Sequence, residues 1–225
     1  MRRKCWDTPV PERGSGQPPP EAASNHRDKP KPIVKHRHFP PEWAEQSAVV
    51  IAWPTEDGAF ADCLDEAVNT YRRIACEISR REAVIIACPD DRLRAPILDG
   101  LLNLGADPER VHFVTLGYDD IWVRDTAPLS IETDEGPLLL NFRFNGWGGK
   151  YACARDAEFG QGLAHSGVFG DVGSESSSIV LEGGSIESDG EGTLLTTRFC
   201  LGNPNRNPTL SETELEGRLQ DRFGI

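Results

Sequence analysis

Residues 181–197, LEGGSIESDGEGTLLTT, contain the first candidate for chemistry in this sequence. Glu182 directly follows an apolar run, and two glycines come after it. An acidic turn over residues 189–192 then leads into a β-type run, which predicts a hairpin. A hairpin does not require a carboxylate at the end of a buried strand, beside glycines that leave room for the backbone. Glu182 is therefore a candidate functional carboxylate, although a hydrogen-bonded structural glutamate accounts for it equally well at this stage.

The stretch DDIWVRDTAP, residues 119–128, holds a second candidate carboxylate. As part of a strand over residues 121–133, it places Trp122 and Asp125 on opposite faces, and a local bend would bring them to one site. A carboxylate at such a position suits a planar cation, because carboxylate–guanidinium pairing can be bidentate. The alternative is a structural pair between Arg124 and Asp125, with Trp122 in the core.

A third stretch, FRFNGWGG at residues 142–149, places Trp147 between an Asn-Gly and a Gly-Gly pair. This pattern predicts a turn that exposes an aromatic face, and on its own it also fits the tip of a hairpin. The five histidines lack the spacing of metal ligands, so we expect no metal site. The sequence contains neither a glycine-rich phosphate loop before a helix nor a serine nucleophile elbow.

The elements that must position these residues begin with alternating strands and helices. Short continuous apolar runs are typical of strands covered on both faces, and the intervening segments have helical periodicity. We expect strands at 47–53, 83–88 and 110–116, and helices at 61–82 and from Asp90 or Asp91 to about Leu104. This order predicts an α/β fold.

The second half of the chain is richer in predicted strands. Two strands, at 121–133 and 136–149, are expected to meet at a Gly/Pro turn, and a polar stretch follows to about residue 175. The capping box from Ser211 to Glu214 predicts a final helix that ends at Gly224. Because the alternation calls for a strand after that helix, we expect the chain to break off within a larger fold.

Charge and composition limit the classes of partner. The chain has 225 residues and a net charge of −12. Residues 1–38 carry nine Lys/Arg and four Asp/Glu and are rich in proline, which predicts a disordered basic leader; docking of this leader on an acidic partner is the alternative. The remaining residues, 39–225, carry −17, which disfavours nucleic acid and is compatible with a cationic substrate.

The sequence also predicts a compartment. There is no run of 18 apolar residues and no apolar signal region, so we expect neither a membrane span nor secretion. The six cysteines are scattered without paired spacing, which favours free thiols over a disulfide framework. Both features indicate the reducing cytoplasm.

Four ordered blocks of this sequence resemble the agmatine deiminase and bacterial peptidylarginine deiminase family. They are PPEWAEQSAVVIAWP, DDIWVRDTAP, FRFNGWGGKY and LEGGSIESDGEGTLLTTRFCLGNPNRNP. The resemblance runs from about Phe39 to the C-terminus. It implies a partial pentein fold, an α/β propeller in which about three of five modules are present in residues 39–225.

The resemblance also implies a reaction, hydrolysis of a guanidinium C–N bond. In that family a cysteine thiolate attacks the guanidino carbon, ammonia leaves, and water releases a ureido product. No metal or organic cofactor is needed. The implied partner is a small cationic guanidino substrate such as agmatine, or an arginine side chain.

Roles follow from the resemblance for individual residues. Asp125 matches the aspartate that clamps the guanidinium, and Trp122 matches the aromatic residue beside the substrate. Glu182 matches the glutamate that polarises the catalytic histidine, so Asp125 and Glu182 are the expected catalytic residues. Trp53 and Trp147 are expected to bind substrate together with Trp122.

Two departures from the family pattern shape the prediction. The His-x-Asp motif and the late nucleophilic cysteine are absent before Ile225, and Ala59-Phe60 replaces an Asp-Trp pair. We therefore expect the chain to be the N-terminal portion of a guanidino hydrolase, inactive alone, with a complementary C-terminal fragment or a homo-oligomer as its partner.

Two other interpretations remain at this stage. A non-catalytic pentein-like module that binds a cationic amine or a partner protein is the main alternative. A tryptophan-rich carbohydrate module is disfavoured by the linear order of the four blocks.

Overall fold

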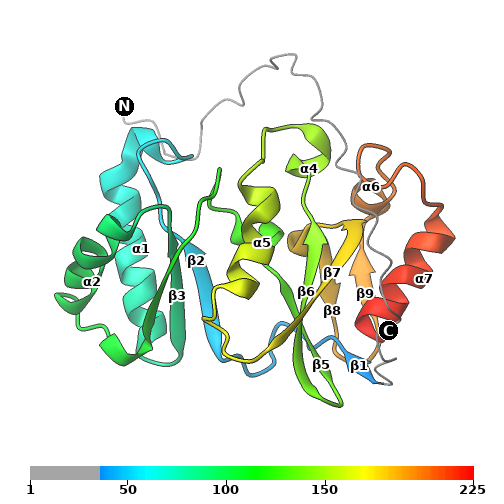
Figure 1. Ribbon diagram of the computed structural model, residues 1–225, viewed down its shortest axis with the longest axis horizontal. Coiled ribbons are helices and arrows are strands. Elements are labelled where there is room, and N and C mark those ends of the chain that lie inside the picture. Colours follow the sequence, from blue (N-terminus) through cyan, green and yellow to red (C-terminus); the bar gives the residue numbers. More distant parts are fainter. Residues whose placement is uncertain (1–35) are drawn as a thin grey trace.

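The structure is a computed structural model and describes residues 36–225. Its strands form three sheets, with the orders β2-β3-β4, β1-β5-β6-β7 and β8-β9. Figure 1 shows the helices α1 and α2 at one end of the molecule, α5 in the middle and α7 at the other end. This α/β arrangement accounts for about three modules of a pentein fold. Most of the predicted leader, residues 1–35, lies outside the described residues.

The first sheet is parallel and is covered on both faces. Its strands are β2 (Ala48–Ala52), β3 (Ala83–Cys88) and β4 (Val111–Thr115), and all three predicted strands are confirmed. Alternate side chains of β3 point to opposite faces, so Ile86 packs with α1 (Leu64–Ser79) and α2 (Arg94–Leu102), whereas Ile85 packs with α5 (Asp156–His165). Burial on both faces is the reason why these strands are continuously apolar.

Short 3₁₀ turns lead into several of these elements. They are η1 (Ala61–Cys63), η2 (Asp91–Leu93), η3 (Pro108–Arg110) and η4 (Gly183–Ser185). Asp90 caps η2 by accepting a hydrogen bond from the backbone N–H of Arg92 at 2.8 Å. The predicted start of the second helical segment at Asp90 is therefore confirmed.

The second sheet combines antiparallel and parallel pairs. Its strands are β1 (Arg37–His38), β5 (Leu129–Thr133), β6 (Gly136–Arg143) and β7 (Gly173–Val180); β6 pairs antiparallel with β5 and parallel with β7. The helix α7 (Glu212–Phe223) covers it, burying Leu215, Leu219 and Phe223 against Ile131, Leu140 and Ile179. The capping box at Ser211 and the left-handed Gly224 (φ 70°) end this helix as predicted.

The predicted strand over residues 121–133 is wrong in its first half. Residues Val123–Thr126 form one helical turn, α3, and the strand begins only at Leu129. Ala127 precedes a proline and is extended (ψ 158°), because the proline ring disfavours the helical region for the residue before it. The chain therefore turns at α3 and extends after it, which changes where Asp125 points.

Two further differences concern the stretch from β6 to β7. The strand predicted at 136–149 ends at Arg143, and the residues Gly146–Gly149 form the turn α4. The polar stretch to about residue 175, for which the sequence predicts no element, contains α5, whose buried Phe159 and Leu163 lie four residues apart. Glycines and charged residues weaken the periodicity of this helix in the sequence.

The hairpin predicted around residues 189–192 is confirmed. Its strands are β8 (Ile186–Ser188) and β9 (Leu194–Thr196), and Gly190 (φ 72°) and Gly192 (φ 97°) supply the positive φ angles of the turn. A last turn, α6 (Arg198–Leu201), follows β9.

Arg37 and His38 fall in the predicted leader but form the strand β1. Arg37 and Arg222 both bond Glu175, at 3.0 and 2.9 Å, which fixes this short strand on the second sheet. These two residues therefore belong to the folded part. Their short strand lacks the apolar run by which strands are recognised in a sequence.

Within residues 36–225, no helix is long and apolar enough to cross a membrane. Cys76, Cys88, Cys153 and Cys200 are free thiols, as expected, whereas Cys63 is disulfide-bonded, contrary to the expectation for that residue.

Candidate functional site

The carboxylate of Asp125 lies on α3 and is held by two N–H donors. Its Oδ1 atom accepts from the backbone N–H of Gly184, and its Oδ2 atom accepts from Nε1 of Trp147, both at 3.0 Å. Together these two neutral donors fix the orientation of the carboxylate. Arg124 pairs instead with Glu42, so the proposed Arg124–Asp125 structural pair does not form.

The two glycines after Glu182 are explained by this contact. A Cβ atom on Gly183 would collide with the backbone carbonyl of Arg124, and one on Gly184 would collide with Oδ1 of Asp125. The absence of side chains therefore lets η4 pack directly on α3. The two candidate stretches, separated by about 60 residues, meet at this point.

Glu182 lies two residues after the end of β7, directly before η4, and is buried, with 3% of its surface exposed. Its two carboxylate oxygens accept hydrogen bonds from Nε of Arg206 at 2.9 and 3.0 Å. The side chains of both residues are more than nine-tenths buried, so each charge depends on the other. Within the described residues the partner of Glu182 is an arginine.

The loop 203–207 fixes this ion pair and was missed as a functional element by sequence reasoning. Asn207 bonds both backbone groups of Val180, accepting from N at 3.0 Å and donating to O at 2.9 Å. Asn205 O accepts from Nδ2 of Asn145 at 2.8 Å. The asparagine-rich sequence NPNRN was the available signal, because asparagine side chains bond backbone groups in irregular segments.

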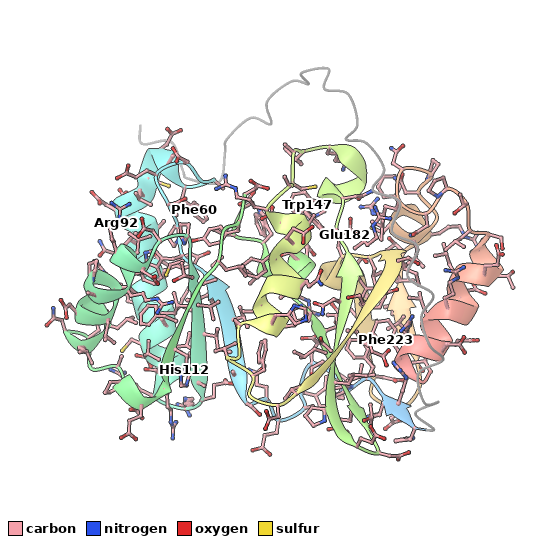
Figure 2. All side chains as sticks on the ribbon, in the orientation of Figure 1. Phe60, Arg92, His112, Trp147, Glu182 and Phe223 are labelled. Atoms are coloured by element: carbon pink, nitrogen blue, oxygen red, sulfur yellow. The ribbon has the colours of Figure 1, made fainter. Side chains whose placement is uncertain are left out.

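Trp147 is the only non-glycine residue with positive φ in the part of the chain that the structure describes (φ 56°, ψ 45°). Its ring makes edge contacts with Phe144 at 4.9 Å and Tyr151 at 5.6 Å between centroids. Figure 2 shows Trp147 and Glu182 in the upper middle of the view, with Phe223 below them and to the right. The predicted exposed aromatic face is thus half-buried, and its N–H points at Asp125.

Trp122 immediately precedes α3 and remains 49% exposed. It lines a pocket of about 460 Å³, whose other walls include Ile51 of β2 and Tyr71 of α1. Burial desolvates the neighbouring Asp120 and raises its pKa. Hydrogen bonds from the backbone N–H of Ile121 and from the Trp122 side chain lower this pKa but do not cancel the effect of burial. Trp122 therefore lies on the same turn as Asp125 but faces a largely apolar pocket.

Trp53 is not brought to these carboxylates. Its side chain is 3% exposed and packs in the core beneath α1, with its ring edge-on to Tyr71 at 6.0 Å. Its backbone carbonyl accepts a hydrogen bond from the hydroxyl of Tyr118 at 2.5 Å. Of the four predicted site residues other than Glu182, the structure gathers Asp125 and Trp147, places Trp122 next to them, and buries Trp53 elsewhere.

No group of three or more His, Cys, Asp or Glu side chains between residues 36 and 225 is arranged to hold a metal ion. The site is instead built from two carboxylates, an indole N–H, a backbone N–H and one guanidinium. In this set the Asp125 carboxylate can hold and orient a cation, because two donors fix it and each of its oxygens keeps further acceptor capacity.

The chain is similar to agmatine deiminases from several bacteria. The chain is 34% identical to the agmatine deiminase of Stutzerimonas stutzeri over 84% of its length and 50% of that enzyme, and equally identical to the agmatine deiminase of Pseudomonas syringae pv. tomato over the same shares. The chain therefore spans about half the length of these relatives.

Solved structures agree with this. A putative arginine deiminase from Porphyromonas gingivalis matches with a TM-score of 0.72 and 37% identity, over 84% of this chain and 55% of that one. A C. jejuni agmatine deiminase with substrate bound matches with a TM-score of 0.73 and 27% identity, over 84% and 54%. The family pattern described as Porphyromonas-type peptidyl-arginine deiminase matches residues 38–225. The chain accordingly belongs to the Porphyromonas-type peptidyl-arginine deiminase family.

Proposed function

We propose that residues 36–225 form the guanidinium-binding part of a guanidino C–N hydrolase acting on agmatine or peptidyl-arginine. The observation that carries the proposal is the Asp125 carboxylate, fixed in orientation by Gly184 and Trp147. A planar guanidinium donates two parallel N–H groups, and a carboxylate of fixed orientation accepts both. The names of the relatives support this substrate class.

Trp122 and Glu182 complete the proposed site. Trp122, exposed beside Asp125, offers an aromatic surface on which the planar cation stacks. Glu182 is proposed to act on a proton-transfer group, such as a histidine, supplied from outside the described residues. That role requires Glu182 to exchange its bond with Arg206 for the new partner, or to share its oxygens between the two.

The 225-residue chain alone is proposed to bind but not to turn over. The cysteine nucleophile and the histidine acid implied by the resemblance are not among the hydrogen-bond partners of the Asp125 and Glu182 carboxylates in the described part of the chain. Removing groups that act as a unit loses most of the catalysis. Ammonia released from agmatine by the pure chain, above a Glu182→Gln control, would contradict this.

Calorimetric titration with agmatine tests the binding step. Asp125→Ala is expected to abolish binding, whereas Asp134→Ala, in the exposed turn between β5 and β6, is expected to leave it unchanged. Equal affinity of wild type and Asp125→Ala, or no binding by either, would reject Asp125 as the guanidinium ligand.

We also propose that the chain associates with a complementary C-terminal fragment or with itself. Two grooves support this: the pocket of about 460 Å³ beside β2, and one of about 600 Å³ beside β9 that Leu194, Leu215 and Leu219 help to line. Each lies at a strand with one unpaired edge in the described sheets. A complementary fragment would supply strands to both, and sedimentation of the chain with and without that fragment measures the association.

A non-catalytic amine-binding module is the second candidate. It is favoured by the Glu182–Arg206 pair, because a glutamate that is already neutralised by arginine is not free to act on a proton donor. Addition of the complementary fragment separates the two candidates, since only the hydrolase gains ureido product.

A further inference from the structure

The backbone of Trp147 is strained, although the turn that carries it is rich in glycine. A tryptophan at φ 56° and ψ 45° occupies the left-handed region, which costs on the order of 1–3 kcal/mol for a side chain of this kind. The neighbouring glycines at positions 146, 148 and 149 also have positive φ, which costs a glycine little because it has no Cβ atom. Trp147 is therefore the one residue of this turn whose side chain adds strain, and the contacts of that side chain must offset the cost.

The side chain is fixed from two sides. Phe144 and Tyr151 meet the indole ring edge-on, with interplanar angles of 89° and 87°, which prevents the ring from rotating. The remaining polar atom, Nε1, donates to Oδ2 of Asp125 at 3.0 Å. With Oδ1 bonded to Gly184, this second bond fixes the plane of the carboxylate.

The turn itself is tied to another part of the chain by Asn145. Its Oδ1 atom accepts from the backbone N–H of Gly148 at 2.9 Å, and its Nδ2 atom donates to Asn205 O at 2.8 Å. Arg206 follows directly and holds Glu182. One loop therefore links the supports of both carboxylates, so the position of Trp147 depends on the same residues that position Glu182.

We infer that Trp147 is a positioning residue that sets the plane of the Asp125 carboxylate and thereby makes the site selective for guanidinium over ammonium. The inference rests on the proposed guanidinium binding at Asp125. It replaces the expectation from sequence that the indole itself contacts substrate. A guanidinium fork needs both oxygens in one plane, whereas an ammonium ion bonds a single oxygen from many directions.

Selectivity is measured by calorimetry with two ligands, agmatine and 1,5-diaminopentane. Trp147→Phe keeps the ring but removes the donor, and is expected to weaken agmatine binding roughly tenfold while leaving the diamine within about twofold. Trp43→Phe, at a residue that is 76% exposed, is the matched control. An equal loss of affinity for both ligands, or no loss for either, overturns the inference. A residue with a merely structural role would not change the ratio of the two affinities.

Asn145→Ala provides a second variant that leaves every side chain at Asp125 intact. It removes the cap on Gly148 and the link to Asn205, so Trp147 is released from its turn. The ratio of agmatine affinity to 1,5-diaminopentane affinity is expected to fall as it does in Trp147→Phe, in a protein whose circular dichroism spectrum matches that of wild type. An unchanged ratio in the folded variant counts against the inference.

A spectroscopic measurement separates this inference from the proposed function. The indole N–H resonance of Trp147, assigned by its loss in Trp147→Phe, is expected to move and to exchange faster with water in Asp125→Ala but not in Asp134→Ala. If wild type binds no agmatine, the proposed function fails, and this resonance alone decides the positioning role. A resonance unchanged by Asp125→Ala overturns that role.

Discussion

The parallel sheet and the carboxylate site are built on opposite principles. The strands β2, β3 and β4 are held by apolar side chains that pack into a buried cluster on each face of the sheet. The site is held by a few specific polar bonds, from Trp147 and Gly184 to Asp125 and from Arg206 to Glu182. Damage to the sheet should therefore scale with lost volume, whereas damage to the site should depend on which partner is left unpaired.

The largest expected effect comes from Arg206→Met. It leaves the buried Glu182 carboxylate without a partner, and breaking one side of a buried pair typically costs about 3–5 kcal/mol. Urea denaturation measures the free energy of unfolding. Arg198→Met, at a side chain that is 83% exposed, is the control and should stay within about 0.5 kcal/mol of wild type.

A double variant, Arg206→Met with Glu182→Met, makes this prediction sharper. Replacing both charges should recover much of the stability lost in the single variant, because no unpaired charge remains. Equal losses in the single and double variants would show that the pair contributes through packing alone.

Leu101→Ala tests the parallel sheet. Leu101 is fully buried on α2 against that sheet, so its truncation is expected to cost about 2–5 kcal/mol through lost burial and a cavity. Agmatine affinity, measured where the variant is folded, should not change. A parallel loss of affinity would mean that the two regions are not independent.

Gly183→Ala adds one methyl group where η4 packs directly against the backbone of α3. The new Cβ atom would collide with the backbone carbonyl of Arg124, so α3 must shift, at a cost of about 1–3 kcal/mol. Gly217→Ala, in α7 with no atom near the added methyl, is the matched control. It should stabilise the protein by about 0.5–1 kcal/mol, since alanine is the better helix former.

The smallest effect concerns pH. The pKa of His38 is raised, mainly by its hydrogen bond to the backbone carbonyl of Gly190 and to a lesser extent by Glu132. The bond to Gly190 connects β1 to the turn between β8 and β9. The protonated imidazole stabilises the fold fully below the usual histidine pKa of 6.5, and that contribution is lost as pH rises through the raised folded value. Because the side chain is one-third exposed, we expect less than about 1 kcal/mol.

His38→Gln checks this assignment. The stability of wild type should decline from about pH 6.5 upward relative to the variant, with no difference in slope under more acidic conditions. The same slope in both proteins would assign the pH dependence to other groups.

The sequence predicted the parallel sheet well and the site only in part. Runs such as AVIIAC at Ala83–Cys88 are apolar because both faces are covered, so local composition carries the structural information. Asp125, Glu182 and Trp147 are predicted as site residues from residue type and from resemblance. Their partners are not, because Gly184 and Arg206 act through contacts across about 59 and 24 residues of chain.

The sequence by itself determined the α/β class, the first three strands, the hairpin and the final capped helix, since each depends on periodicity, capping or turn residues within one short segment. The tertiary structure decided that residues 123–126 turn rather than extend, that Trp53 is core, and that Trp147 points its N–H at Asp125. These outcomes depend on which distant backbone and side-chain groups satisfy one another, and local sequence patterns do not encode that pairing.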